Sequence, residues 1–174
     1  MAAKHPTLSA TFAVLGIVTC GFFSAPAAYA EEGLAAPITQ GVNHIGFTVS
    51  DLDGTTALFV DILGWREVGG VPSYPSRFVT DGSVFVTLWR ATNPEEATPF
   101  DRKNNVGLHH FAMTVADLET LDELHATLEA HPKVVVEFAP QLNGAGPTVH
   151  MMVRGPSGLR LEFAVPEGRR RSAQ

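Results

Sequence analysis

Cysteine is almost absent from this chain, whose 174 residues include a single one, Cys20. Cys20 lies in an N-terminal stretch that we expect to be removed, so the mature chain would contain no cysteine. Such a chain has no disulfides, no thiolate metal ligands and no cysteine nucleophile, and it suits an oxidising compartment.

Positive charge is also scarce. The chain has 12 Lys and Arg residues against 18 Asp and Glu residues, a net charge of -6, and loss of Lys4 with the N-terminal stretch would make it about -7. A nucleic acid is therefore not expected as a partner. The basic cluster at residues 169–171 follows Pro166 and Gly168, and we expect residues 167–174 to form a solvated basic tail.

The N-terminus has the pattern of a secretory signal peptide over residues 1–30. Lys4 opens it, residues 8–23 are apolar, and Ala28-Tyr29-Ala30 is a small-x-small cleavage site. The apolar stretch is short for a membrane span of about 20 residues. We expect cleavage before Glu31, a short N-terminal segment at residues 31–40, no stable membrane anchor, and a periplasmic or secreted protein. A lipid on Cys20 is the alternative, although Thr19 is bulkier than the residue that usually precedes such a cysteine.

Two stretches of the chain are nearly the same: residues 44–52 (HIGFTVSDL) and residues 110–118 (HFAMTVADL). Each begins with a histidine, continues with apolar residues that alternate with small or polar ones, and ends in Asp-Leu before a helical pattern. Alternation is typical of a half-buried strand, so the apolar residues share one face and the histidine lies on the other. If the two halves pack symmetrically, His44 and His110 face one cavity, and paired imidazoles indicate a metal.

The rest of each half extends the repeat. The first half predicts a strand from residue 42, a helix over 53–63 ended by Gly64, and strands at 65–68, 77–80 and 84–89, with a turn and loop from Gly69 to residue 76. The second half predicts a strand over 108–115, a helix over about 118–130, a strand at 134–138 and a hairpin over 149–165 that turns at residues 156–158.

The polar residues 91–107, which contain two prolines, separate the halves as a linker. We therefore predict an α+β fold made of two tandem βαβββ units, at about residues 41–90 and 108–166.

Asp51 and Asp117 recur at equivalent positions, each where a strand ends and a helix begins. An aspartate there caps free backbone N–H groups and suits the positive end of the helix dipole. We expect both to be helix caps and exclude them from the site.

This duplicated unit, with a histidine on each first strand, resembles the vicinal oxygen chelate superfamily, which includes glyoxalase I, extradiol dioxygenases, and fosfomycin and bleomycin resistance proteins. The resemblance covers residues 41–166. It includes residues 155–163 (GPSGLRLEF), which are similar to the family's closing hairpin with its metal-binding glutamate. The resemblance implies curved sheets that form a cupped, barrel-like cavity, in which a divalent metal chelates two adjacent oxygens of a small-molecule substrate.

Carried over by position, the resemblance makes His44, His110 and Glu162 the metal ligands. Alternation supports Glu162 independently, because Leu161 and Phe163 would point to the helices and turn Glu162 to the cavity face. A solvated glutamate outside the sheet is the alternative.

The chain departs from the glyoxalase I pattern at the fourth ligand, usually a Glu or Gln on the last strand of the first unit. Alternation gives Thr87 at that position, and a shift of one residue gives Val86. Neither is a good ligand or a general base, so the glyoxalase proton transfer lacks a carrier.

Two histidines and one carboxylate leave open positions on a metal, which suits Fe(II) binding both a catechol-like substrate and dioxygen. Fe(II) is therefore favoured, with Mn(II), Zn(II) and Ni(II) as alternatives. Extradiol dioxygenases add a histidine and a tyrosine near the metal, but the hairpin before Glu162 offers His150 and no tyrosine. His150 is the candidate catalytic acid or base, unless it is merely solvated, and His109 could be a surface residue.

A metal-free binding protein is the second functional hypothesis, since some resistance proteins of this superfamily keep the cup and line it with aromatics. We favour a metalloenzyme because three polar groups converging in an apolar cup are costly without a partner. The sequence leaves open whether the cavity closes within one chain or between the chains of a homodimer. The residues expected to line the substrate cavity are Tyr74, Phe85, Thr87, Trp89 and Met152.

Overall fold

The structure is a computed structural model that describes residues 38–39 and 41–169. Its contacts divide the chain into Met1–Gln40 and Gly41–Gln174, and the second unit holds the fold described below. The expected signal peptide lies outside the described residues. Among the described residues, no helix is long and apolar enough to cross a membrane.

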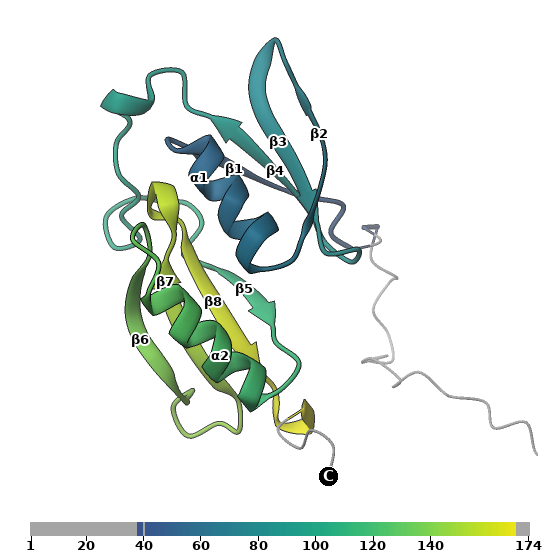
Figure 1. The fold of residues 1–174 in the computed structure, drawn as a ribbon, viewed down its shortest axis with the longest axis vertical. Helices are drawn as coiled ribbons and strands as arrows, with labels where there is room; N and C mark the ends of the chain where they lie inside the picture. Colours follow the sequence, from purple (N-terminus) through teal and green to yellow (C-terminus); the bar gives the residue numbers. More distant parts are fainter. Residues whose placement is uncertain (1–37, 40, 170–174) are drawn as a thin grey trace, which may run out of the picture. The chain divides into compact units, whose positions relative to one another are not determined.

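The first half of the fold is a four-stranded sheet crossed by one helix (Figure 1). The strand order is β1-β4-β3-β2, with β1 parallel to β4 and the other pairs antiparallel. Its elements are β1 (Ile45–Val49), α1 (Leu52–Ala57), β2 (Arg66–Val71), β3 (Tyr74–Thr80) and β4 (Phe85–Arg90).

The second half repeats this topology, with the order β5-β8-β7-β6 and with β5 parallel to β8. The prediction of an α+β fold with two βαβββ units is confirmed. The sheets are open and do not close into barrels. The elements are β5 (Phe111–Thr114), α2 (Leu118–Glu129), β6 (Val135–Leu142), β7 (Val149–Arg154) and β8 (Arg160–Val165).

Alternation along the strands sorts their side chains between a buried face and an open one. Phe47 and Val49 of β1 are buried, whereas Gly46 and Thr48, which alternate with them, are exposed. The buried residues of both sheets join one apolar cluster with Leu121 and Leu128 of α2. Burial of these side chains contributes roughly 1.5–3 kcal/mol each, which fixes the side of each sheet that faces the helices.

Three predicted elements differ from the observed ones. The helix expected over 53–63 is α-helical only to Ala57 and continues as a π-helix over Leu58–Ile62. The Gly69-Gly70 pair, predicted as a turn, lies within β2, where two register shifts against β3 accommodate it. β6 continues past Phe138 to Leu142, again with register shifts. Patterns in one strand do not reveal such bulges, because a bulge depends on the partner strand.

Both repeated aspartates cap helices, as predicted. Asp51 Oδ1 accepts a hydrogen bond of 2.9 Å from Gly54 N, and Asp117 Oδ1 accepts one of 2.8 Å from Thr120 N. Each bond satisfies a backbone donor at the start of a helix that has no partner within the helix.

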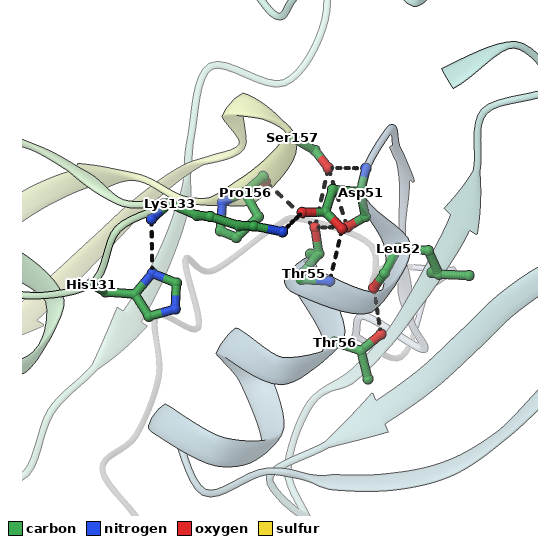
Figure 2. Close-up of polar contacts among 9 residues, drawn as sticks. Asp51, Leu52, Thr55, Thr56, His131, Lys133, Pro156 and Ser157 are labelled. Carbon is green, nitrogen blue, oxygen red and sulfur yellow. Dashed lines mark hydrogen bonds and ion pairs between the residues drawn. The ribbon is translucent and has the colours of Figure 1, made fainter. Parts of the chain in front are cut away.

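Asp51 also joins the two halves of the fold (Figure 2). Its backbone N donates to Ser157 Oγ over 2.8 Å, and its carboxylate accepts from Lys133 Nζ over 2.6 Å. Thr55 Oγ1 lies 3.2 Å from Ser157 Oγ. Ser157 and Lys133 belong to the second half, so the start of α1 is held by the turn before β8 and by the segment before β6.

Candidate metal centre

Glu162 occupies the centre of the second sheet. On β8 it pairs with Ala112 of β5 on one side and with Met152 of β7 on the other. Its neighbours Leu161 and Phe163 are buried in the core, so the period of two turns the Glu162 side chain to the opposite face, as predicted. Glu162 is nevertheless only 9% exposed. A buried carboxylate requires polar partners.

Two histidines provide those partners. His110 Nε2 lies 3.0 Å from Glu162 Oε2, and His150 Nδ1 lies 2.5 Å from Glu162 Oε1. The ring of His150 packs against Phe138, with 4.9 Å between ring centroids. The structure therefore brings together two of the predicted ligands and the predicted acid or base.

His44, the third predicted ligand, immediately precedes β1 of the first sheet. Its Nδ1 hydrogen-bonds Asn43 Oδ1 over 2.8 Å, and its ring meets the edge of Phe85. Among residues 38–39 and 41–169 no group of three or more His, Cys, Asp or Glu side chains is placed to hold a metal ion. Convergence of His44 with His110 and Glu162 thus stays a prediction.

The donor atoms on the second sheet fit a divalent metal. An imidazole nitrogen and a carboxylate oxygen 3.0 Å apart have the spacing of two adjacent ligands, each about 2.1 Å from one ion. His150 hydrogen-bonds the other carboxylate oxygen, as outer partners of metal ligands commonly do. His110 and Glu162 would hold the metal, and His150 would orient Glu162.

Thr87 is the residue expected at the position of the fourth glyoxalase ligand. Val86 is fully buried in the core, whereas Thr87 pairs with Gly46 on β1 and accepts a 2.9 Å hydrogen bond from Trp89 Nε1. Alternation therefore predicted the face of Thr87 correctly. A β-carbon at Gly46 would lie 3.2 Å from Thr87 Oγ1, so β1 and β4 approach closely here.

Aromatic rings follow the same face of the first sheet from His44 outward. Phe85 contacts Phe78, Phe78 contacts Trp89, and Trp89 contacts Tyr74, with 5.1–5.8 Å between centroids. Tyr74, Phe85 and Trp89 were predicted to line the cavity. Phe78 was not, although alternation along this strand puts it on the same face as Tyr74. Met152, also predicted, is buried beside Glu162.

An arginine on β8 lies near His110 and Glu162. Arg160 Nη1 is 3.4 Å from His109 Nδ1, and His109 Nδ1 is 2.8 Å from His110 Nδ1. Desolvation, the guanidinium of Arg160 and the ring of His110 lower the pKa of His109. The lowered pKa favours the neutral ring of His109, which contacts His110. Arg160 was not predicted as a site residue, although it stands two residues before Glu162.

Several solved structures share this fold. A glyoxalase/bleomycin resistance/dioxygenase domain from Frankia is 23% identical, with a TM-score of 0.62 over 74% of this chain and 93% of that chain. The fosfomycin resistance protein FosX from Listeria monocytogenes is 17% identical, with a TM-score of 0.60 over 74% and 94%. A lactoylglutathione lyase from Agrobacterium tumefaciens is 21% identical, with a TM-score of 0.55 over 75% and 97%.

Comparison with curated protein sequences gives no significant match. The family model of the glyoxalases, however, matches residues 41–163, which include both βαβββ units, His44, His110 and Glu162. The chain belongs to the Glyoxalase/Bleomycin resistance protein/Dioxygenase superfamily.

Proposed function

We propose that this protein is an exported, metal-dependent enzyme that acts on a small molecule with two adjacent oxygen atoms. The observation that carries the proposal is the pairing of His110 with the buried carboxylate of Glu162, beside His150. A buried carboxylate and two imidazoles without a cation are costly, and a divalent metal removes that cost. FosX from Listeria, a member of the same superfamily, has been crystallised with Mn(II) and 1S,2S-dihydroxypropylphosphonic acid.

The third ligand in this proposal is His44 of a second copy of the chain. His44 immediately precedes β1 and meets the ring of Phe85 on the first sheet, and Glu162 lies on the second sheet, on the face opposite its buried neighbours. A two-fold dimer can place the first sheet of one chain against the second sheet of its partner and form two equivalent sites. His44 would enter each site beside the aromatic rings of Phe85, Phe78 and Trp89.

A divalent metal held by His110 and Glu162, with Fe(II) favoured, would supply Lewis acidity toward the oxygens of the substrate. His150 holds a proton on Nδ1 against Glu162 and can exchange a proton with the substrate through its other ring nitrogen. The aromatic rings of the first sheet bind the apolar part of the substrate and exclude water.

Oxygen-dependent cleavage or Lewis-acid chemistry is favoured over a glyoxalase reaction. Thr87 stands where the glyoxalase carboxylate would be, and its hydroxyl already accepts a hydrogen bond from Trp89. A threonine hydroxyl is too weak a base to take a carbon-bound proton.

The test combines metal content with activity. Mature protein loaded with Fe(II), Mn(II), Zn(II) or Ni(II) is assayed against catechols with oxygen uptake recorded, and against the methylglyoxal–glutathione adduct. Glu162→Gln and His110→Ala should lose the metal and the activity. Asp61→Asn, a change on the surface of the first half, is the matched control and should retain both. Fast turnover of the glutathione adduct would contradict the reaction class proposed here.

A metal-free binding protein is the second candidate, and the row of aromatic rings on the first sheet favours it. Such a protein would bind aromatic or drug-like molecules equally well with and without metal. Trp89→Ala would then abolish binding, while His110→Ala would leave it unchanged.

Export is proposed from the signal-like N-terminus alone. Mass spectrometry of the exported protein should find a chain that begins at or near Glu31. A chain that retains residues 1–30, or a lipid on Cys20, would contradict this part of the proposal.

A further inference from the structure

Three arginines surround a single carboxylate beside the metal centre. Glu137 Oε2 lies 2.8 Å from Arg160 Nε, while Glu137 Oε1 lies 3.5 Å from Arg154 Nε and 3.9 Å from Arg102 Nη1. We refer to Arg102, Arg154 and Arg160 as the arginine cluster. They come from the linker and from strands β7 and β8, so the fold gathers positive charge from three separate segments.

The cluster carries more positive charge than its carboxylate neutralises. Guanidinium groups stay protonated in proteins, so Glu137 offsets only one of the three charges. Arg160 is the most confined, because its side chain is only 9% exposed, and that of Glu137 is 15% exposed. The charge that Glu137 leaves unbalanced is carried by Arg102 and Arg154, whose side chains are 31% and 52% exposed, so it is open to an anionic partner.

The cluster also borders a pocket. All three arginines and Glu137 line it, together with the polar side chains of Thr98 and Asn105 and the apolar side chain of Val135. Asp101, another carboxylate in the wall, instead binds Asn104 Nδ2 and the backbone N of Lys103. Half of the Arg154 side chain is exposed, so guanidinium N–H groups remain available to a bound group.

The position of the cluster links it to the metal centre. Arg160 precedes Glu162 by two residues on β8, so both side chains leave the same face of the sheet, about 7 Å apart along the strand. Arg160 also contacts His109, which in turn contacts His110. One small molecule can therefore reach both places at once.

We propose that the arginine cluster binds an oxyanion of the substrate, a carboxylate or a phosphoryl group, while the metal holds the adjacent oxygens. That the anion belongs to a substrate rests on the proposed function, but anion binding itself can be measured without a metal. Arginine suits this role because its planar N–H groups bind two oxygens of one oxyanion side by side. The cluster would thus select anionic substrates over neutral ones of the same shape.

The test is calorimetric titration of the metal-free mature protein with inorganic phosphate and, in a second arm, with acetate. We expect saturable binding of one anion per chain that weakens with added salt. Arg154→Gln and Arg102→Gln should each weaken it about tenfold, the usual effect of losing a charge-assisted hydrogen bond. Tighter binding of phosphate indicates a phosphoryl substituent, and tighter binding of acetate indicates a carboxylate.

Arg77→Gln is the matched control. Arg77 is also a partly exposed, ion-paired arginine, but it lies on the first sheet between two carboxylates, Glu67 at 3.3 Å and Asp53 at 3.9 Å. Its loss should leave anion binding unchanged. Arg160→Gln is not used alone, because it leaves the confined Glu137 without its nearest cation. Arg154 and Arg102 are more exposed than Arg160 and lie further from Glu137, so their substitution avoids that problem.

The inference is overturned if neither anion binds, or if binding is the same in Arg154→Gln, Arg102→Gln and the parent protein. Equal weakening by Arg77→Gln would overturn it too, because the effect would then be one of net charge. Metal content, measured on the same variants, separates the two proposals. Anion binding without any metal binding would refute the proposed enzyme and keep the anion site, whereas metal binding without anion binding would do the reverse.

Discussion

The side chain of Asp51 caps a helix of the first unit and also forms an ion pair with the second unit. Its carboxylate caps α1 through Gly54 N and binds Lys133 Nζ from the second half. Asparagine caps helices about as well as aspartate but lacks the charge. Because the Asp51 side chain is 36% exposed, solvent screens the ion pair. We therefore expect Asp51→Asn to lower the free energy of unfolding by about 0.5–1 kcal/mol and Asp51→Ala by about 1–2 kcal/mol. Urea denaturation at neutral pH measures both.

The same residue makes stability depend on pH. The hydrogen bond from Lys133, and then that from Gly54 N, lower the pKa of Asp51 below its ordinary value of 3.8. A carboxyl whose pKa is lower in the folded chain stabilises the fold above the unfolded value, and this contribution is lost as the pH falls through the folded value. Between neutral pH and pH of about 3, Asp51→Asn should therefore lose less stability than the parent protein.

Lys133→Gln provides the control for the pH experiment. It keeps the cap but removes the main cause of the lowered pKa, so its unfolding curve should resemble that of Asp51→Asn in pH dependence. An unchanged pH dependence in both variants would contradict the assigned role of the ion pair.

Ser157 combines a strained backbone with a hydrogen bond between the two halves. It is the one non-glycine among the described residues with a positive φ, 65°, and its hydroxyl accepts from Asp51 N. Alanine would lose the hydrogen bond and keep the strain, at about 1–3 kcal/mol, whereas glycine would lose the bond and relieve the strain. We expect Ser157→Gly to be more stable in thermal unfolding than Ser157→Ala, and the reverse order would contradict this account.

Alternation within one strand was enough to predict which residues face the open side of each sheet. Thr87 and Glu162 lie on the predicted face because the residues on either side of each are apolar core residues. His44 immediately precedes β1, so alternation within that strand does not test its predicted face. The partners of Glu137 could not be predicted this way. They depend on which residues lie opposite one another across β6, β7 and β8, and register shifts in β6 alter that pairing.

The hairpin of β2 and β3 depends on Gly70, which was predicted to lie in a turn. A β-carbon on Gly70 would lie 2.4 Å from the carbonyl oxygen of Ser76, a backbone atom that cannot move aside alone. Gly70→Ala should therefore destabilise the fold by about 1–3 kcal/mol and disturb the ring of Tyr74 at the end of the hairpin. Thermal unfolding and tryptophan fluorescence, which reports on Trp89 beside Tyr74, measure the two effects.

Gly168→Ala is the control for that substitution, because nothing lies within 4 Å of its β-carbon position. It should unfold like the parent protein. A Gly70→Ala protein of unchanged stability would mean that the two strands are further apart than described.

One of the two helices was predicted closely from the sequence, and the form of the other was not. The spacing of Leu121 and Leu128 predicted α2 closely, since both face the core at helical intervals. The change to a π-helix at Leu58 in the first half was not predicted. An extra residue per turn leaves the apolar character of the segment unchanged, so hydrophobic periodicity does not reveal it.

At the scale of the whole molecule, the repeat predicted two equivalent units, but it could not decide how they meet. Within the described chain, hydrogen bonds join Asp51, at the start of α1 in the first unit, to Ser157 and Lys133 of the second. His44 contacts Asn43 and Phe85 rather than His110 or Glu162. A duplicated sequence is compatible with a site closed within one chain and with a site formed between two chains, because both arrangements bury the same apolar faces.

The proposed dimer makes a prediction that separates the two arrangements. If each site combines His44 of one chain with His110 and Glu162 of its partner, then a heterodimer of His44→Ala and Glu162→Gln chains contains one site with both substitutions and one with neither. Each parent homodimer has two defective sites. The heterodimer, isolated through different tags on the two chains, should bind about one tight metal ion, while each homodimer binds none tightly. Calorimetry or metal analysis gives the count, and neither depends on knowing the substrate.

Sites closed within single chains give a different result, because every chain of the heterodimer then carries one defective site and no tight metal ion is recovered. A heterodimer of His110→Ala and Glu162→Gln chains is the matched control. His110 and Glu162 lie 3.0 Å apart in the same chain, so both sites of that heterodimer are defective in either arrangement. Tight metal binding by the first heterodimer and not by the second would place His44 in the partner's site. Loss of metal from both would assign the sites to single chains and would require the two sheets of one chain to rearrange.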